Sequence, residues 1–191
     1  MKKSTFTLLL LILPFFVFAH GGHGTGFMAG LTHPIFGIDH LLAIFTIGVI
    51  AHQFKDLNRW LLPLAFLVPM LVGGFLGVGA DGYPGEELII KSSVFLLGLS
   101  LALNLKIGAI LSMIVLAVFG FFHGHAHGVE MPEGSIAWQY FGGVVIGVAI
   151  AVGLGNLASM LLSNEKEQLF LRIVGGFMTV SYTHLTLPTK A

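Results

Sequence analysis

The sequence predicts an all-α integral membrane protein: a bundle of about six transmembrane helices after a cleaved signal peptide. Of the 191 residues, 55% are hydrophobic and only 9% are charged, whereas about 25% of residues are charged in ordinary soluble domains. Mean hydropathy is +0.93. The apolar residues gather into long runs that short polar connections separate, which is the pattern of a polytopic membrane protein.

Composition also excludes several classes of function. Formal net charge is zero and no basic run occurs beyond the extreme N-terminus, so no nucleic-acid partner is expected. The chain has no cysteine, which leaves nitrogen and oxygen as metal ligands. The sequence has no Gly-rich phosphate loop ending in Gly-Lys, so ATP hydrolysis on this chain is not expected. No prosthetic group is expected either.

The N-terminus has the features of a secretory signal peptide over residues 1–19. Two lysines precede an apolar stretch over 6–18, and Ala19 closes a suitable cleavage site. An uncleaved first helix is the alternative, although the stretch is shorter than the roughly 20 residues that span a bilayer. After cleavage, His20 and His23 would lie near a free amine outside the cytoplasm, where they either collect metal or belong to a polar leader without a metal role.

Six apolar runs form the predicted transmembrane domain, residues 20–180, and a polar tail follows over 181–191. The runs cover residues 34–52, 60–79, 87–105, 107–128, 136–162 and 168–180. The last is too short to span, and we expect the tail to be non-native sequence after a truncation. The bilayer is one expected partner of the chain, and the sequence leaves a homo-oligomer open.

The charged residues of the connections predict the orientation. Basic residues occupy one set of connections: Lys55, Arg59, Lys106, Lys166 and Arg172. Acidic residues occupy the alternate set: Asp81, Glu86, Glu87, Glu130 and Glu133. The positive-inside rule places the basic set in the cytoplasm and the acidic set outside. An external mature N-terminus after signal cleavage agrees with this orientation.

A first histidine motif opens the first apolar run. His33 and His40 are seven residues apart, so a straight helix would separate them by about 10.5 Å along its axis, too far for one metal ion. Pro34 and Gly37 permit a break, so either the backbone folds the two ligands together or they are successive stations. Asp39 would offset the charge of a divalent cation or orient a neighbouring imidazole. For His33 alone, a place at the lipid interface is an equal alternative.

A second motif ends the fourth run. His123 and His127 are four residues apart, which places both imidazoles on one helix face. His125 would then project to the opposite face, whereas an extended strand would put all three histidines on one side. Glu130 follows three residues after His127 and would share its face. The alternative is an external loop that is merely polar, but polar groups next to such an apolar segment are costly and usually functional.

Glu87 begins the third run on the same predicted external side as both motifs. It is either a helix N-terminal carboxylate that the helix dipole stabilises or part of an ion entrance. The acidic residues of this side would raise the local concentration of cations.

Together, the two motifs resemble the signature sequences of the HupE/UreJ family of bacterial nickel or cobalt permeases. The matching segments are His33-Pro34-x-x-Gly37-x-Asp39-His40 and Phe122-His123-Gly124-x-Ala126-His127-Gly128-x-Glu130, and the resemblance extends over nearly the whole mature chain. It implies a metal path formed by His33, Asp39, His40, His123, His127 and Glu130, with Glu87 matching a family glutamate. It also implies uptake of Ni²⁺ or Co²⁺ into the cytoplasm and a location in the bacterial inner membrane. The tail departs from the family pattern.

Two other functions use the same residues. An intramembrane zinc hydrolase would hold Zn²⁺ with three histidines and use Asp39 or Glu130 as general base. An external metal sensor would need a larger soluble domain than the sequence contains. A permease is the leading interpretation because the histidines lie in two motifs near the external side, and exchangeable ligands along a path suit transport. Protons would compete with the metal for these histidines.

Overall fold

The computed structural model describes residues 25–54, 58–105, 107–162 and 165–186, and over these ranges the chain is helical without a strand. The predicted signal peptide, His20 and His23 lie outside the described residues. The helices are α2 (Phe27–Phe36), α3 (Ile38–Gln53), α4 (Leu61–Gly77), α5 (Glu86–Leu103), α6 (Ala109–Val129), α7 (Ala137–Leu161) and α8 (Glu165–Thr186). The all-α membrane bundle that the sequence predicts is confirmed.

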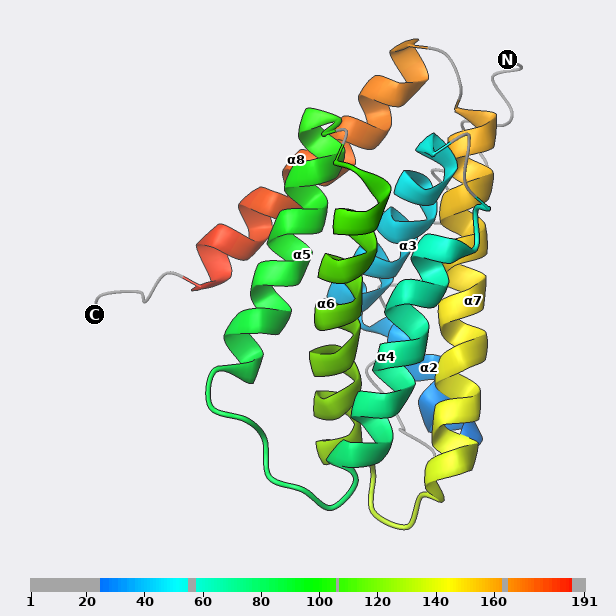
Figure 1. Ribbon diagram of the computed structural model, residues 1–191, viewed down its shortest axis with the longest axis vertical. Helices are drawn as coiled ribbons and strands as arrows, with labels where there is room; N and C mark the ends of the chain where they lie inside the picture. The colour runs from blue at the N-terminus through cyan, green and yellow to red at the C-terminus, as the bar shows by residue number, and fades with distance from the viewer. Residues whose placement is uncertain (1–24, 55–57, 106, 163–164, 187–191) are drawn as a thin grey trace.

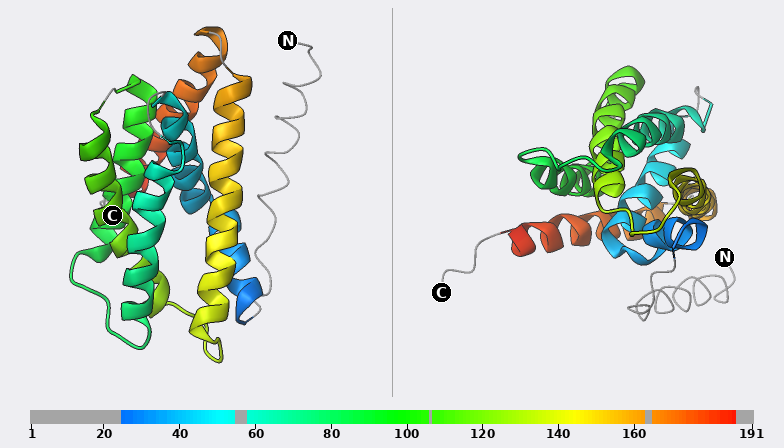
Figure 2. Two further views of the ribbon diagram at one scale, coloured as in Figure 1. Left: turned by 45° about the vertical axis from the view of Figure 1, so that its right-hand side comes forward. Right: turned by 90° about the horizontal axis from the view of Figure 1, so that it is seen from below.

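The helices form an elongated bundle whose members run roughly along its long axis (Figure 1). The four most extensive helix pairings build it: α4 lies along α6, α7 lies along both α2 and α3, and α5 packs against α8. Helix α8 crosses obliquely and its C-terminal end points away from the other helices, as the view from below also shows (Figure 2). A central core of buried apolar side chains draws on α3, α4, α5, α6 and α7.

Each of the six apolar runs contains helix, but the first and the last differ from the prediction. The first begins at Phe27 rather than Pro34, and it is two helices, α2 and α3, that meet at Gly37. The last is longer than its apolar run, because α8 continues to Thr186, inside the predicted polar tail. Apolar runs mark the segments that reach lipid or core, whereas backbone hydrogen bonding carries a helix beyond them.

Glycines bring α4 and α6 into direct backbone contact. A Cβ atom on Gly124 of α6 would overlap the carbonyl oxygen of Met70, and one on Gly73 of α4 would overlap that of Phe121. Gly77, Gly120 and Gly128 lie in the same seam. Close approach of small residues is the usual way that membrane helices associate, since lipid offers no hydrophobic driving force between them.

The outer surface is apolar, as a bilayer requires. Large apolar side chains are exposed along α4, α6, α7 and α8, with Phe177 on α8 at 70% exposure. Among the described residues, α6 and α7 are each long and apolar enough to cross a membrane, and α2 with α3 makes a third crossing if the bent pair is one span. The segments Leu61–Gly77 and Gln168–Val180 are shorter apolar helices.

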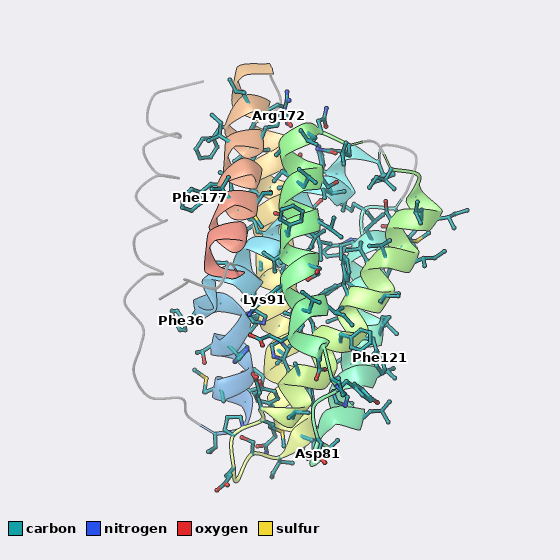
Figure 3. All side chains as sticks on the ribbon, turned by 90° about the vertical axis from the view of Figure 1, so that its left-hand side faces the viewer. Phe36, Asp81, Lys91, Phe121, Arg172 and Phe177 are labelled. Carbon is teal, nitrogen blue, oxygen red and sulfur yellow. The ribbon has the colours of Figure 1, made fainter. Side chains whose placement is uncertain are left out.

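The acidic connections and the basic connections that the sequence predicts lie at opposite ends of the bundle, although Glu165 begins α8 at the basic end. The connections α4–α5 and α6–α7 lie at one end and carry the acidic residues, whereas the α5–α6 connection lies at the other (Figure 1). Asp81 and Arg172 mark these two ends in Figure 3. The Arg172 Nε–H donates to the Ala102 carbonyl at 2.9 Å, which ties α8 to the last turn of α5. The alternating connections that the sequence predicts are therefore present.

Candidate metal centre

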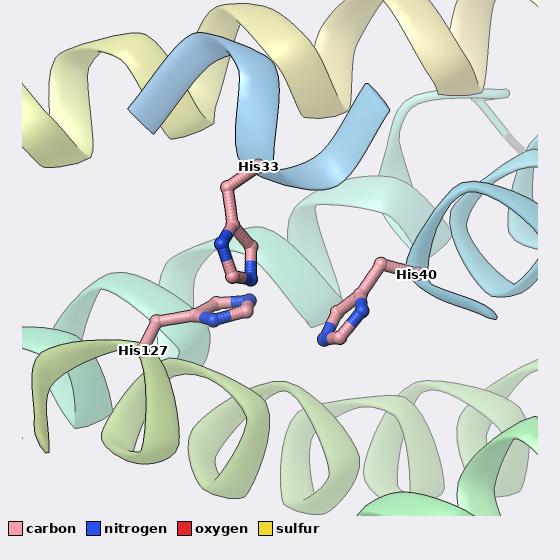
Figure 4. A group of neighbouring side chains, drawn as sticks. All are labelled: His33, His40 and His127. Atoms are coloured by element: carbon pink, nitrogen blue, oxygen red, sulfur yellow. The ribbon is translucent and has the colours of Figure 1, made fainter. Parts of the chain in front are cut away.

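Three imidazoles from three helices converge in the acidic half of the bundle. They belong to His33 of α2, His40 of α3 and His127 of α6, and one ring nitrogen from each lies within 4.8 Å of the other two. Figure 4 shows the three rings pointing toward one another between the helices. His127 is buried, and His33 and His40 are half-buried.

The break at Gly37 brings His33 and His40 together. Gly37 has φ −72° and ψ 100°, an extended conformation. Its N–H donates to the His33 carbonyl at 3.0 Å, and its carbonyl accepts from the Leu41 N–H at 2.8 Å, so this one residue ends α2 and begins α3. The two helices meet at 75°, and the His33 and His40 ring centroids are 5.3 Å apart. Of the two arrangements left open by the sequence, the structure has the folded one.

Pro34 is not where the helix breaks. It lies inside α2, buried, and its ring occupies the space that a side chain on Gly147 of α7 would need. A second small-residue contact holds the other end of α2, because a Cβ on Gly30 would overlap the Tyr140 carbonyl. The α2 helix is therefore seated directly on α7, which fixes the direction from which His33 enters the site.

The three rings suit one transition-metal ion. Imidazole nitrogens bind such ions at about 2.0 to 2.1 Å, so two nitrogens on one ion are at most about 4 Å apart. The observed spacing, within 4.8 Å, needs only small side-chain rotations to reach that value. The His127 Nδ1 atom is buried and has no hydrogen-bond partner among the described residues. A neutral imidazole group of this kind accepts Ni²⁺, Co²⁺ or Zn²⁺.

His123 continues the cluster one turn further into the bundle. Its ring centroid is 5.7 Å from that of His40, and the side chain is 3% exposed. The His123 Nδ1 atom lies 2.9 Å from the Phe119 carbonyl oxygen. A carbonyl only accepts, so Nδ1 carries the proton and Nε2 keeps the lone pair that a metal needs. A backbone bond of this kind orients a histidine ligand.

His125 lies on the other side of α6, as regular helical spacing predicts. Its Nδ1 is 2.9 Å from the Glu86 Oε1 atom, and the two side chains are 2% and 8% exposed. The ring also packs against Tyr83, with centroids 4.3 Å apart. This buried pair is absent from the sequence-based prediction, which selected Glu87 instead of Glu86. If α6 is helical, His125 lies at membrane depth on the face away from the other histidines and needs a polar partner of its own. That requirement could have predicted a nearby buried carboxylate from the sequence.

The remaining predicted ligands lie outside the three-histidine group. Glu87 is 80% exposed and pairs with Lys91 at 2.6 Å. Glu130 is exposed at the end of α6, where its N–H donates to the Ala126 carbonyl at 2.9 Å. The backbone of Asp39 belongs to α3, but its side chain is not among the described ones. His20 and His23 are likewise outside the described part of the chain.

Similarity to known proteins identifies the family of this chain. The family model described as "HupE / UreJ protein" matches residues 8–185. The chain belongs to the HupE/UreJ family. "Protein HupE" of Rhizobium leguminosarum bv. viciae is 36% identical over 181 residues, which cover 94% of this chain and 95% of that protein. No solved structure matches significantly.

HupE/UreJ membership supports a general role in metal transport and does not favour the hydrolase alternative. Members of the family are transporters rather than enzymes. The site gives this role a physical basis, because it places nitrogen ligands from three different helices in one group near the acidic end of the bundle.

Proposed function

We propose that this HupE/UreJ protein takes up Ni²⁺ or Co²⁺ across the bacterial inner membrane into the cytoplasm. One observation carries the proposal: His33, His40 and His127 present ring nitrogens within 4.8 Å of one another inside an apolar bundle. Ionisable groups at membrane depth are costly and usually mark an ion path. Imidazole is a ligand that these borderline divalent ions prefer.

Ions would enter from the acidic end of the bundle. Under the positive-inside rule this end faces the periplasm, and Arg59 and Arg172 face the cytoplasm. His33 lies six residues from the start of α2, a depth of about 9 Å along the helix. An incoming cation is therefore attracted by carboxylates first and meets imidazoles next.

The ring contacts form a sequence of stations directed inward. The centroid of His33 is 4.5 Å from that of His127, His127 is 5.0 Å from His40, and His40 is 5.7 Å from His123. Each step is short enough for an ion to exchange one imidazole for the next without leaving the ligand set. Such shared and replaceable ligation suits transport better than the closed site of a structural metal.

Apolar side chains of the core lie next to His123. The Phe66 ring is 5.6 Å from the His123 ring, and Ile44, Ile47 and Phe119 are buried in the core. A divalent ion in such surroundings would pay a desolvation cost of several kcal/mol or more. Release to the cytoplasm therefore requires the helices to move, so the protein acts as a carrier and not as an open pore.

Uptake of submicromolar Ni²⁺ and Co²⁺ by cells that express the chain tests the proposal. His127→Ala and Asp39→Ala are compared with wild type at matched membrane levels. His52→Gln is the control, because His52 lies on α3 with His40 but twelve residues further on, about 18 Å along the helix. We expect wild type and His52→Gln to accumulate metal and the other two to fall to background. Equal uptake by wild type and His127→Ala would refute the proposed path.

A further inference from the structure

The α6 helix carries polar side chains on two sides, and only one side belongs to the metal centre. His123 and His127 face α2 and α3, whereas His125 faces the first turn of α5 and contacts Glu86. The Glu86–His125 pair is more deeply buried than two of the three clustered histidines. In the described part of the chain, its contacts are with Tyr83 and Phe121, so its role has to be explained separately.

Glu86 is held rigidly at the start of α5. Gly85, with φ +82° and ψ 2°, adopts the left-handed conformation that turns the chain into the helix. The second carboxylate oxygen, Oε2, then accepts the Tyr83 N–H at 3.2 Å. A carboxylate in a first helical turn is stabilised by the helix dipole. Glu86 is thus a fixed point to which His125 is tied by a charge-assisted hydrogen bond.

A third side of α6 meets α4 along the glycine seam, where Gly124 and Gly128 lie against backbone atoms of Met70, Gly74 and Gly77. This seam is the most extensive contact of α6 and fixes its distance from α4. The polar contact of α6 with α5 is the Glu86–His125 bond, which has a fixed direction and length. A displacement of α6 relative to α5 would therefore have to break or lengthen this bond.

Metal ligation is sensitive to such displacements. Ligand distances have to be met within about 0.2 Å, and two of the stations, His123 and His127, move with α6 while His33 and His40 do not. We infer that Glu86 and His125 are positioning residues: their bond sets the height and rotation of α6, and thereby the spacing between the histidines of α6 and those of α2 and α3. This inference rests on the proposed function for its consequence, but the restraint itself is independent of metal.

Apolar replacement of the pair separates positioning from mere stability. Glu86→Met and His125→Phe each leave one buried partner without the other, which lowers the melting temperature. The double variant Glu86→Met/His125→Phe removes both polar groups at similar volume, and such replacements are often neutral or stabilising. We expect the double variant to recover its melting temperature without recovering the position of α6. Ser93→Ala is the matched control, because Ser93 is buried on α5 and its hydroxyl donates to the Ile90 carbonyl of its own helix.

The position of α6 is read from spin labels. The chain has no cysteine, so Met28→Cys on α2 and Val118→Cys on α6, which are 55% and 48% exposed, give one defined pair for electron–electron distance measurement in purified full-length protein. Co²⁺ titration followed by its visible absorption gives the metal affinity of the same variants. We expect the double variant to show a shifted or broader distance distribution and about tenfold weaker Co²⁺ binding, comparable to the loss of an outer-shell partner.

The outcomes distinguish the two proposals. A double variant with the wild-type distance distribution overturns the positioning role, and so does a Ser93→Ala variant that moves α6 as far. If the distances change in the double variant while wild type binds no Co²⁺, the positioning role stands and the proposed transport function fails. If wild type binds Co²⁺ and the double variant binds it equally well, the pair does not act on the metal centre and the inference is overturned.

Discussion

The two sides of the last turns of α6 carry the same side chain in opposite states. On one side His125 is paired with a carboxylate inside the protein, at 2.9 Å. On the other, His127 lies among other imidazoles, and its Nδ1 has no hydrogen-bond partner among the described residues. Burial is similar, 2% and 4% exposed, so depth does not distinguish them.

The difference shows what makes a buried histidine available to an ion. A ring that donates to a fixed carboxylate is satisfied and serves to hold helices together. The His127 ring keeps a nitrogen, Nδ1, without a hydrogen-bond partner among the described residues, and such a nitrogen is available to a cation. A histidine-rich segment therefore combines two functions, and only the identity of the neighbouring helix separates them.

The largest effect should come from removing ligands of the three-histidine group. In the double variant His33→Gln/His40→Gln, the group loses two of its three imidazoles, so Co²⁺ affinity should fall by more than about a hundredfold, beyond what outer-shell changes cause. Titration of the purified protein with Co²⁺ measures this. Retention of wild-type affinity would show that metal binds elsewhere, with Asp39 and Glu130 as the first residues to test.

The second-largest effect should come from a substitution in the glycine seam between α4 and α6. Gly124→Ala places a Cβ against the Met70 carbonyl and should lower the free energy of unfolding by about 1 to 3 kcal/mol. Gly153→Ala on α7, where a Cβ meets nothing within 4 Å, is the control and should melt like wild type. Melting in detergent measures both variants. If both glycines tolerate alanine equally, α4 and α6 are not in backbone contact there.

A smaller and more selective effect is expected at His123. If it is the next station after the three-histidine group, His123→Gln should lower the maximal uptake rate by about tenfold while Co²⁺ affinity changes less than about threefold, because the first binding step is kept. Uptake kinetics and Co²⁺ titration on the same variant separate rate from affinity. Parallel losses in both would instead place His123 in the first binding group.

The smallest effect should follow a change in the exposed neighbour of Glu86. Glu87 is 80% exposed and pairs with Lys91, so Glu87→Gln removes one screened charge at the entrance. Uptake at limiting metal should fall by about two- to threefold at low ionic strength and be unchanged at high salt. Complete loss of uptake at both salt concentrations would assign Glu87 to the metal path, as the family resemblance implies.

The features that the sequence predicted best are those with a clear helical periodicity and a high free-energy cost of burying a polar side chain. The spacing of His123 and His127 predicted one shared helix face, and it placed His125 opposite, where the structure has it. The Pro34 to Gly37 segment predicted a break but not its site, because both residues perturb a helix. Contact between α2 and α7 decided that Pro34 stays helical and Gly37 does not. At the C-terminus, the composition of 181–191 did not indicate that α8 continues to Thr186.

The chain's sequence by itself determined that this is a helical membrane protein with two histidine motifs and with basic residues in alternate connections, because hydropathy, helical period and charge are local properties. The tertiary structure alone decided that imidazoles from α2, α3 and α6 share one group and that Glu86 is buried while Glu87 is exposed. Both depend on how helices rotate against one another. That rotation is set by contacts between residues far apart in the chain, at the glycine seam and at the Glu86–His125 bond, which no local pattern encodes.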